Sequence, residues 1–521
     1  MTTTEFPSRG PANLIGDEAI PIPGDGIASV DPADPSRVVW SGTPEEGHVE
    51  RAVAAARAAQ PAWARLPIDE RARVLRRFQD LCKQHAAEIA SLICDETGKA
   101  LWDCQAEAGL LAGKVDITLD DSTNSGLSRV TGFEVPITDS RIGRCSFRPH
   151  GVMAVVGPFN FPAHLPNGHI VPALLMGNTI VFKPSDKTPA VGQMLGALYR
   201  RALRDCDHPA GVVNVVQGAA GPAKALVSHP GIDGILFTGS WPVGRRILEA
   251  NLDRPSRIVA LEMGGNNPAV VLPDANLRQA AIEIVRAAFI TTGQRCTCTR
   301  RLIVHRDAAD RLLPAIVKAA STLIIGDPRA DHPVFMGPIA TAEARDGVQR
   351  FQQSAIEQGA RPMLESTAID GPAVGGRAGG WYVSPGILQV ERFTPDESND
   401  AGCDIEVFGP LLRVAIVDSL DDAIAQANAT RYGLAASIFT RDRDTIDRFA
   451  MESRAGCINV NTGTAGASSK LPFGGLGLSG NHRPAGAFSL DYCAYPVAGL
   501  IETGDAAPLP TGMAFDDDWI S

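Results

Sequence analysis

Short apolar runs alternate with helix-length segments through the middle of this 521-residue chain. The runs are strand-sized and rich in Val, Ile and Leu, which is typical of strands buried on both faces. They are residues 151–156, 179–183, 212–216, 232–237 and 258–261. Strands that alternate with helices predict a parallel, doubly wound sheet, so we expect an α/β fold.

The regions around this core have different patterns. Residues 1–47 are rich in Pro and Gly and predict an extended arm with a few short strands, whereas apolar spacing over 49–119 predicts helices. Gly98 is expected to end one of these helices. Alternating residues over 132–147 predict a β-hairpin. From residue 501 the chain is acidic and contains Pro, as in a surface tail.

Composition narrows the function classes. A net charge of −11 argues against nucleic acid or an anionic membrane as a partner, although a local basic pocket can still bind an anionic small molecule. The apolar runs are too short to span a bilayer, and residues 1–17 have no secretory pattern. The ten cysteines form neither a disulfide framework nor a zinc-ligand pattern. We therefore expect no metal and a reducing, cytoplasmic setting.

Two residues stand out for their chemistry. Glu262 precedes a Gly-Gly-Asn-Asn-Pro turn, and Cys296 follows Arg295 in a polar turn. A thiol beside a cation, within reach of a carboxylate, is typical of a nucleophile with its general base. The spacing leaves equally open that Cys296 is a buried structural thiol and Glu262 a solvated acid.

The segments 262–268 (Glu-Met-Gly-Gly-Asn-Asn-Pro) and 293–296 (Gly-Gln-Arg-Cys) resemble the glutamate and cysteine signatures of the aldehyde dehydrogenase superfamily. Further matches extend from about residue 52 to 497. The resemblance implies the fold of that family, with a Rossmann-like cofactor domain, an α/β catalytic domain and a β-hairpin oligomerisation arm. The expected boundaries are 20–130 with 150–261 for the NAD-binding domain, 262–470 for the catalytic domain, 131–149 with 485–500 for oligomerisation, and 501–521 for the tail. A homodimer or homotetramer is implied.

The same resemblance implies catalytic roles for three residues. Cys296 would attack an aldehyde and pass through a thiohemiacetal to a thioester, which Glu262 would hydrolyse as base. Asn160 would form the oxyanion hole with the backbone N–H of Cys296. From its position between a strand and a helix, Asn160 could instead be a helix cap.

A nicotinamide cofactor is implied as well, and ten residues are expected to contact it. They are Pro158, Phe159, Lys183, Ser185, Asp186, Gly239, Ser240, Gly244, Glu406 and Phe408. Asp186 stands where the family commonly has Glu, and a carboxylate there should repel the 2′-phosphate of NADP. We therefore expect NAD rather than NADP.

Three segments narrow the substrate. Residues 160–172, 293–298 and 479–484 with 491–494 resemble the N-succinylglutamate 5-semialdehyde dehydrogenases, a subgroup of the superfamily that serves arginine catabolism. That substrate is anionic, so Arg295, His164 and Arg483 are candidate anchors, although each has an equally good structural explanation. The alternatives are another semialdehyde or aliphatic aldehyde, a CoA-dependent acylating reaction, and a non-catalytic family member.

Overall fold

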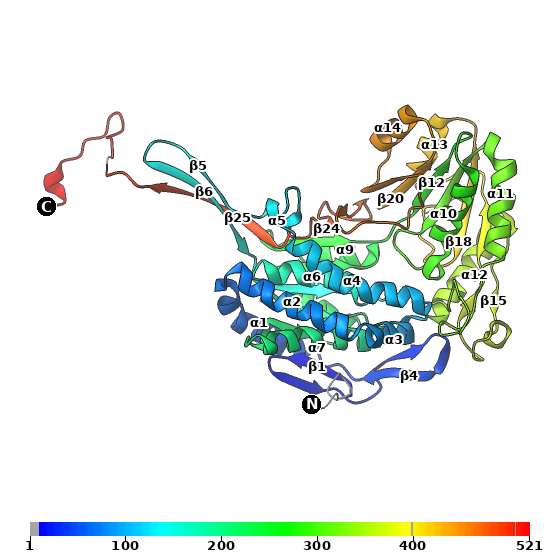
Figure 1. Cartoon of the computed structure of the whole chain (residues 1–521), viewed down its shortest axis with the longest axis horizontal. Coiled ribbons are helices and arrows are strands. Elements are labelled where there is room, and N and C mark those ends of the chain that lie inside the picture. The colour runs from blue at the N-terminus through cyan, green and yellow to red at the C-terminus, as the bar shows by residue number, and fades with distance from the viewer. Residues whose placement is uncertain (1–9, 398–399, 506) are drawn as a thin grey trace.

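Two seven-stranded sheets and a three-stranded arm organise the chain (Figure 1). The computed structural model describes residues 10–397, 400–505 and 507–521. Its longer helices are α1 (Gly47–Arg65), α2 (Ile68–Gln84), α3 (Ala86–Thr97), α4 (Leu101–Leu119), α6 (His164–Leu175), α7 (Pro189–Asp205), α8 (Ala220–Ser228), α9 (Trp241–Glu249), α10 (Leu277–Phe289), α11 (Arg306–Ser321), α12 (Ala342–Glu357), α13 (Leu420–Ala427) and α14 (Arg443–Glu452). Within the described ranges, no helix is both long enough and apolar enough to cross a membrane.

The first sheet contains the five predicted strands, which confirms that part of the sequence analysis. Its order is β11-β10-β7-β8-β9-β1-β2, with β7 to β11 parallel and the two N-terminal strands antiparallel. The strands are β1 (Ala12–Ile15), β2 (Glu18–Pro21), β7 (Val152–Val156), β8 (Thr179–Lys183), β9 (Val213–Val215), β10 (Gly234–Thr238) and β11 (Ile258–Glu262).

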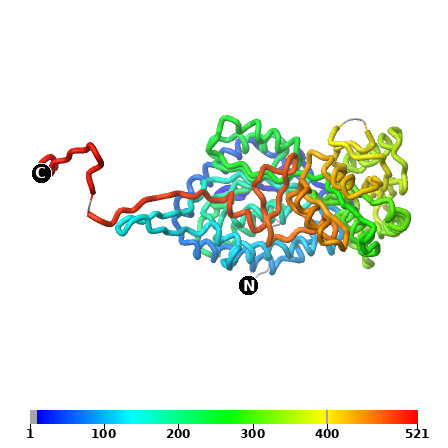
Figure 2. The backbone as a smooth tube through the Cα atoms, turned by 90° about the horizontal axis from the view of Figure 1, so that it is seen from above, coloured from blue at the N-terminus to red at the C-terminus, as the bar shows by residue number. Residues whose placement is uncertain are grey.

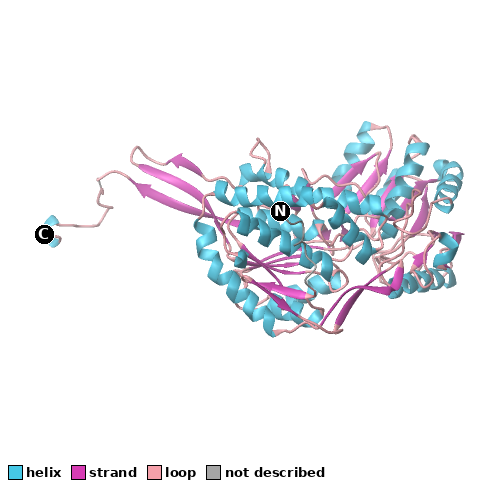
Figure 3. Cartoon of the chain, turned by 60° about the horizontal axis from the view of Figure 1, so that its bottom comes forward, coloured by secondary structure: helices cyan, strands magenta, loops and turns pink. Residues whose placement is uncertain are grey.

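Helices cover both faces of this sheet (Figure 3). Side chains alternate along a strand, so Met153 and Val155 of β7 pack with α2, α6 and α7, whereas Ala154 and Val156 pack with α1, α8 and α9. Every residue of β7, β8, β9 and β10 is buried. This explains why the sequence shows continuous apolar runs there rather than alternation.

Strand β11 lies at the edge of the first sheet, and a late segment completes its outer side. Asn481 Oδ1 accepts from Leu261 N at 3.0 Å, and Asn481 Nδ2 donates to Val259 O at 2.8 Å. Glu262 also forms an isolated antiparallel bridge with Gly480. The sequence of segment 479–484 resembles a subgroup pattern, and in the structure its Asn481 forms hydrogen bonds with the outer edge of β11.

The second sheet follows directly from the first. Only residues 263–266 separate β11 from β12. Its order is β14-β17-β18-β13-β12-β20-β21, parallel except for β14. The strands are β12 (Asn267–Val271), β13 (Thr299–His305), β14 (Arg361–Leu364), β17 (Gly386–Gln389), β18 (Leu411–Val417), β20 (Ala435–Phe439) and β21 (Cys457–Val460). The turn after Glu262 is therefore the crossing point between the two sheets, and Cys296 lies just before β13.

The arm projects from the body of the protein (Figure 2). The predicted hairpin is present as β5 (Phe133–Pro136) and β6 (Arg141–Pro149), which pair antiparallel. Strand β25 (Ala494–Glu502) pairs along the whole of β6 and so runs into the segment expected to be tail.

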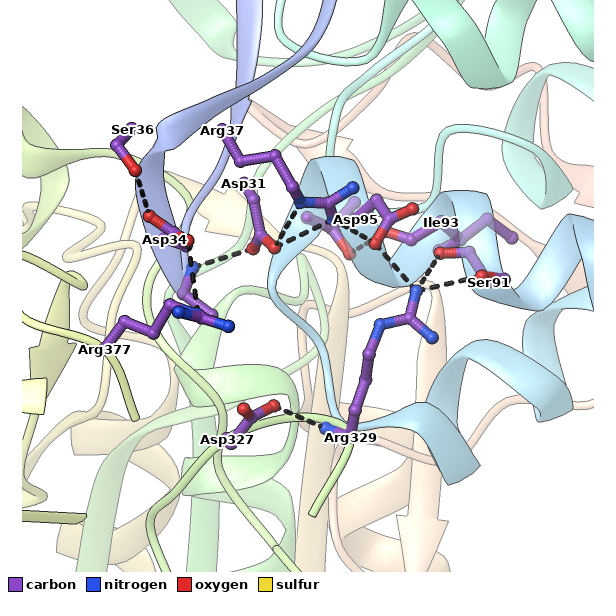
Figure 4. A network of polar contacts seen from close by, with 12 residues as sticks. Asp31, Asp34, Ser36, Arg37, Ser91, Ile93, Asp95, Asp327, Arg329 and Arg377 are labelled. Carbon is purple, nitrogen blue, oxygen red and sulfur yellow. Dashed lines mark hydrogen bonds and ion pairs between the residues drawn. The ribbon is translucent and has the colours of Figure 1, made fainter. Parts of the chain in front are cut away.

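Charged contacts join the N-terminal ribbon to both sheet units (Figure 4). Arg37 of β4 (Asp34–Gly42) pairs with Asp31 of β3 (Ile27–Asp31) at 2.9 Å and with Asp95 of α3. Asp95 also pairs with Arg329 at 2.7 Å, in the segment that follows α11. Helix α3 ends at Thr97 because Gly98 is left-handed (φ +70°), as the sequence predicted.

Candidate active site

The carboxyl ends of four parallel strands surround one large cavity. Strands β7, β8, β10 and β11 of the first sheet end near Gly157, Lys183, Thr238 and Glu262. Ligands of open α/β sheets bind at this edge. The cavity has a volume of about 1280 Å³.

Nine of the ten residues expected to contact a cofactor line this cavity. They are Pro158, Phe159, Lys183, Ser185, Asp186, Gly239, Ser240, Glu406 and Phe408. Gly244 is not in the lining. It is buried in α9, where an added Cβ would lie 2.3 Å from Met263 Sδ, so its small size serves packing.

The cavity residues fit an extended, anionic dinucleotide. The N–H groups of the first turn of α9 receive no side-chain cap from Ser240, which leaves them available to a phosphate. Lys183 is buried beside the cavity and donates to Gly218 O at 2.5 Å; burial lowers its pKa to about 8. Lys187, Lys224 and Arg246 add positive charge, which the sequence analysis did not single out.

A left-handed turn precedes Cys296. Thr291 (φ 55°), Thr292 (φ 53°) and Gly293 (φ 71°) adopt it in succession, which is unfavourable for β-branched Thr. Hydrogen bonds hold this conformation: Thr291 Oγ1 donates to Asp103 Oδ2 at 2.6 Å, and Thr292 Oγ1 donates to Gly337 O at 2.9 Å. A Cβ at Gly293 would lie 2.2 Å from Gly409 O, so only glycine fits there.

Arg295 belongs to the same network. Its guanidinium donates to Asp103 Oδ1 at 2.7 Å and to Thr291 Oγ1 at 2.8 Å, and lies over the Phe161 ring. Burial alone would raise the pKa of Asp103, but the charges of Lys99 and Arg295 hold that pKa below its usual value. Arg295 therefore serves its own loop, the structural explanation that the sequence left open.

The other two candidate anchors lie in different places. His164 begins α6 with its ring edge-on to Phe161, and its Nδ1 is buried without a partner among the described residues. Burial and the charges of Lys114, Lys99 and Arg295 lower its pKa to about 4, so it is neutral at pH 7. Arg483 is exposed and donates to the neighbouring His482 O at 3.4 Å.

Glu262 and Cys296 both hold their protons at neutral pH. Glu262 is 3% exposed, and burial raises its pKa to about 8. Its Oε2 accepts from Thr238 Oγ1 at 3.4 Å, and its Oε1 has no partner within the described part of the chain. Cys296 lines the cavity. Its burial, and to a smaller extent the negative charges of Glu262 and Glu406, raise the pKa of its thiol well above the usual value. The pair is thus electrostatically coupled, and loss of the Glu262 proton creates a base near the thiol.

Two amides bind the nucleophile loop. Asn160 Nδ2 donates to Gln294 O at 2.9 Å, while the N-cap of α6 is Ala163, so Asn160 is not the cap. Its amide nitrogen carries a second N–H that can serve an oxyanion. Asn267 Nδ2 donates to Cys296 O at 2.7 Å and Cys298 O at 2.9 Å, which ties the glutamate motif to the cysteine motif.

Glu406 and Phe408 line the same cavity as Cys296. Glu406 Oε1 accepts from Gly265 N at 3.0 Å, within the turn after Glu262. The Phe408 ring meets Phe159 edge-on with centroids 5.9 Å apart. The cavity thus runs from Asp186 to the thiol of Cys296, along one continuous lining.

Most of the chain matches one known protein family. The model of the aldehyde dehydrogenase family matches residues 22–496. The chain belongs to the aldehyde dehydrogenase family, and it is an aldehyde-oxidising oxidoreductase.

Individual relatives are similar over most of their length. N-succinylglutamate 5-semialdehyde dehydrogenase 2 of Caulobacter vibrioides is 46% identical over 484 residues, covering 91% of this chain and 93% of that protein. N-succinylglutamate 5-semialdehyde dehydrogenase of Novosphingobium aromaticivorans is 42% identical over 492 residues, covering 94% and 99%.

Solved structures share the fold and bind nicotinamide cofactors. Indole-3-acetaldehyde dehydrogenase complexed with NAD+ has a TM-score of 0.86 and 28% identity, covering 94% of this chain and 96% of that one. Glyceraldehyde-3-phosphate dehydrogenase GapN of Methanocaldococcus jannaschii, complexed with NADP, has a TM-score of 0.82 and 26% identity, covering 92% and 99%. The fold therefore accommodates either cofactor.

The contacts of Asp103 lead to a prediction. Asp103→Asn is expected to lower kcat about tenfold or more, because it loosens the left-handed turn that places the thiol, and small misplacements are costly. The rate of Cys296 alkylation by iodoacetamide should change with it. Asp116→Asn is the matched control: it is on the same helix, and its side chain contacts Arg76 and Gln79 of α2 rather than the loop before Cys296. Equal kcat in the two variants would contradict the prediction.

Proposed function

We propose that this chain oxidises N-succinyl-L-glutamate 5-semialdehyde to N-succinyl-L-glutamate, with NAD as its cofactor. The observation that carries the proposal is the similarity, at 41–46% identity over most of the chain, to several proteins of that name. The segments 160–172, 293–298 and 479–484, which carry the subgroup resemblance, support it. Another semialdehyde or an aliphatic aldehyde is the alternative.

The arrangement of the two sheets supports a cofactor-binding domain and a separate catalytic domain. We assign residues 20–130 and 150–261 to cofactor binding and 262–470 to catalysis, since the cavity lies along the carboxyl edge of the first sheet and ends at Cys296. A bound nicotinamide cofactor supplies the hydride acceptor, and Lys183, Asp186, Ser240 and Glu406 are among the residues that would hold it.

In the first half of the reaction, the Cys296 thiol loses its proton to water or to the Glu262 carboxylate, which releases that proton again before hydrolysis begins. The sulfur then bonds to the aldehyde carbon, and the carbonyl π electrons move to oxygen. Asn160 and the backbone N–H of Cys296 donate to this oxygen, which stabilises the thiohemiacetal oxyanion.

The second half of the reaction begins once the hydride has been lost to the cofactor, so that the carbon bonded to Cys296 is a thioester carbon. Glu262 takes a proton from water as the water oxygen attacks the thioester carbon. The carbon–sulfur bond breaks, the acid leaves and the Cys296 sulfur is restored. Glu262 is then protonated and must lose this proton before the next hydrolysis.

NAD is favoured because the carboxylate of Asp186 lies in the cavity lining, where it would repel a 2′-phosphate. Lys187 and Lys224 oppose this effect, so the preference should be finite rather than absolute. A dimer or tetramer is supported by the arm, which exposes Phe133 (58%), Val135 (42%) and Ile137 (52%).

The test is NADH formation by the purified enzyme with succinylglutamate semialdehyde, glutamate semialdehyde or a simple aliphatic aldehyde. A preference for the succinylated substrate of at least about 100-fold in kcat/KM is expected, because a pocket built for carboxylates discriminates strongly against substrates that lack them. Cys296→Ala is the blank, and NADP replaces NAD in a parallel series. Comparable rates on all three aldehydes would refute the substrate assignment, and a product that forms only with CoA would refute hydrolysis.

A further inference from the structure

A chain of buried side chains leads away from Glu262. Thr238 Oγ1 lies 3.4 Å from Glu262 Oε2, His169 Nε2 lies 3.1 Å from Thr238 Oγ1, and Tyr492 Oη lies 2.8 Å from His169 Nδ1. Thr238 is 5% exposed, His169 3% and Tyr492 2%. They come from β10, α6 and the segment before β25, so three distant parts of the chain meet here.

The hydrogen-bond directions follow from the chemistry of the groups. When Thr238 donates its hydroxyl proton to the Glu262 carboxylate, its oxygen must accept from His169 Nε2–H. A neutral imidazole then has an unprotonated Nδ1, which accepts from the hydroxyl of Tyr492. Burial lowers the pKa of His169 to about 3, so the ring is neutral at pH 7. All three bonds therefore point toward the carboxylate, and all three reverse when His169 changes tautomer.

A buried amine lies at the far end. Tyr492 hydrogen-bonds Ser489, whose Oγ accepts from Lys114 Nζ at 2.8 Å. Lys114 also donates to Gly486 O at 2.8 Å, is 3% exposed and forms no ion pair with a described carboxylate. Burial lowers its pKa to about 8, similar to that of Glu262, so near pH 8, where part of the amine is unprotonated, a proton can be exchanged between them at little cost.

We propose that Thr238, His169 and Tyr492 carry the proton of Glu262 to Ser489 and the Lys114 amine, and so regenerate the base after each hydrolysis. The proposal rests on the role of Glu262 given above. Glu262 releases one proton to Thr238, and Thr238, His169, Tyr492 and Ser489 each accept one proton and pass one on. Lys114 changes from amine to ammonium and must lose this proton to water before the next turnover. Apart from Glu262 and Lys114, every group ends with the number of protons with which it began.

Thr238 alone touches Glu262, so His169 and Tyr492 are positioning residues. The 3.4 Å link is the longest, and catalytic hydrogen bonds commonly tighten only when the reacting group is bound. The titratable groups around the path are Cys296 and Cys457 near Glu262, Lys114 near His169, His164 near Lys114, and Cys493, Asp491 and His150 near Tyr492; burial lowers the pKa of both His150 and His164. The thiols have pKa values raised by burial, so Lys114 is the nearby group that can accept a proton near pH 8.

The experiment isolates thioester hydrolysis from hydride transfer. An activated ester, 4-nitrophenyl acetate, acylates Cys296 directly, and hydrolysis of this acyl-enzyme then depends on Glu262 without any aldehyde or cofactor. Tyr492→Phe removes one oxygen from the path. His169→Gln keeps a donor toward Thr238 but has no second tautomer. Tyr199→Phe is the control, since this buried tyrosine bonds Asn167 of α6, away from Glu262.

Deacylation is expected to slow about tenfold or more in Tyr492→Phe and His169→Gln, and not in Tyr199→Phe. In Tyr492→Phe the inflection of the deacylation rate near pH 8 should also move to higher pH, because loss of the Tyr492 donor weakens the aligned hydrogen bonds that favour the Glu262 anion. Unchanged deacylation and pH dependence in both folded variants would overturn the proposal. If one variant does not fold, the other decides. Failure of the succinylated substrate assay leaves this ester assay unaffected, so the two proposals fail separately.

Discussion

Replacing Cys296 by serine is expected to lower kcat for aldehyde oxidation at least about 1000-fold. A hydroxyl is a far weaker nucleophile than a thiol, and the surroundings of Cys296 already disfavour the anion by burial and by the charges of Glu262 and Glu406. Serine would need stronger activation, and the site offers less. Cofactor binding, measured by calorimetry, should stay within a factor of about three, because the lining of the cavity is otherwise unchanged.

The neighbouring thiol provides the control. Cys298 is fully buried, two residues further on, and does not line the cavity. Cys298→Ala should keep most of its activity, and the acyl group from 4-nitrophenyl acetate should be found by mass spectrometry on the peptide at Cys296. Activity of Cys296→Ser within tenfold of the wild type would refute its role as nucleophile.

Glu262→Gln is expected to trap the thioester. The first turnover should still release NADH, whereas steady-state turnover should fall about 100- to 10 000-fold, because glutamine cannot take the proton of the attacking water. Rapid mixing would show a burst close to one NADH per site, and intact mass would show the acylated enzyme. The wild-type inflection near pH 8 should be absent from the residual rate. A normal steady state in this variant would show that another group is the base.

The same substitution has a consequence for stability. The pKa of Glu262 is about 8 in the folded chain and near 4.5 when unfolded, so between these values the folded state binds the extra proton. Folding is therefore penalised increasingly as pH rises from 4.5 to 8, by a few kcal/mol at most. Glu262→Gln, which is always neutral, should raise Tm more at pH 8 than at pH 5. An equal shift at both pH values would contradict the raised pKa.

The sequence predicted those structural features that depend on a local pattern of residues, namely the parallel strands and the residues at their ends. The five parallel strands were recognisable because both faces of their sheet are covered, which makes each strand an unbroken apolar run. Nine residues of the cavity lining could be predicted because each follows the end of a strand or lies in a recognisable motif. Gly244 lies outside this lining and packs on Met263, so its expected role in a phosphate turn stays a prediction.

Contacts between distant segments could not be predicted in this way. Asp103 lies in the first turn of α4, and nothing near it in sequence indicates that it binds a loop 188 residues later. Two successive threonines would not be assigned left-handed conformations, because Thr disfavours them unless tertiary contacts compensate. Asn267 had a local signal, since it lies within the glutamate motif, but its partners on the cysteine loop did not.

Because β11 lies at the edge of its sheet, its hydrogen bonding is completed only late in the synthesis of the chain. The strand that ends in Glu262 obtains its outer hydrogen bonds from Asn481, 220 residues later. A nascent chain that has left the ribosome as far as β13 already contains its nucleophile and its base, but the strand bearing the base still has an unpaired edge. Translation must therefore pass residue 481 before the strand that carries Glu262 has hydrogen bonds on both of its edges.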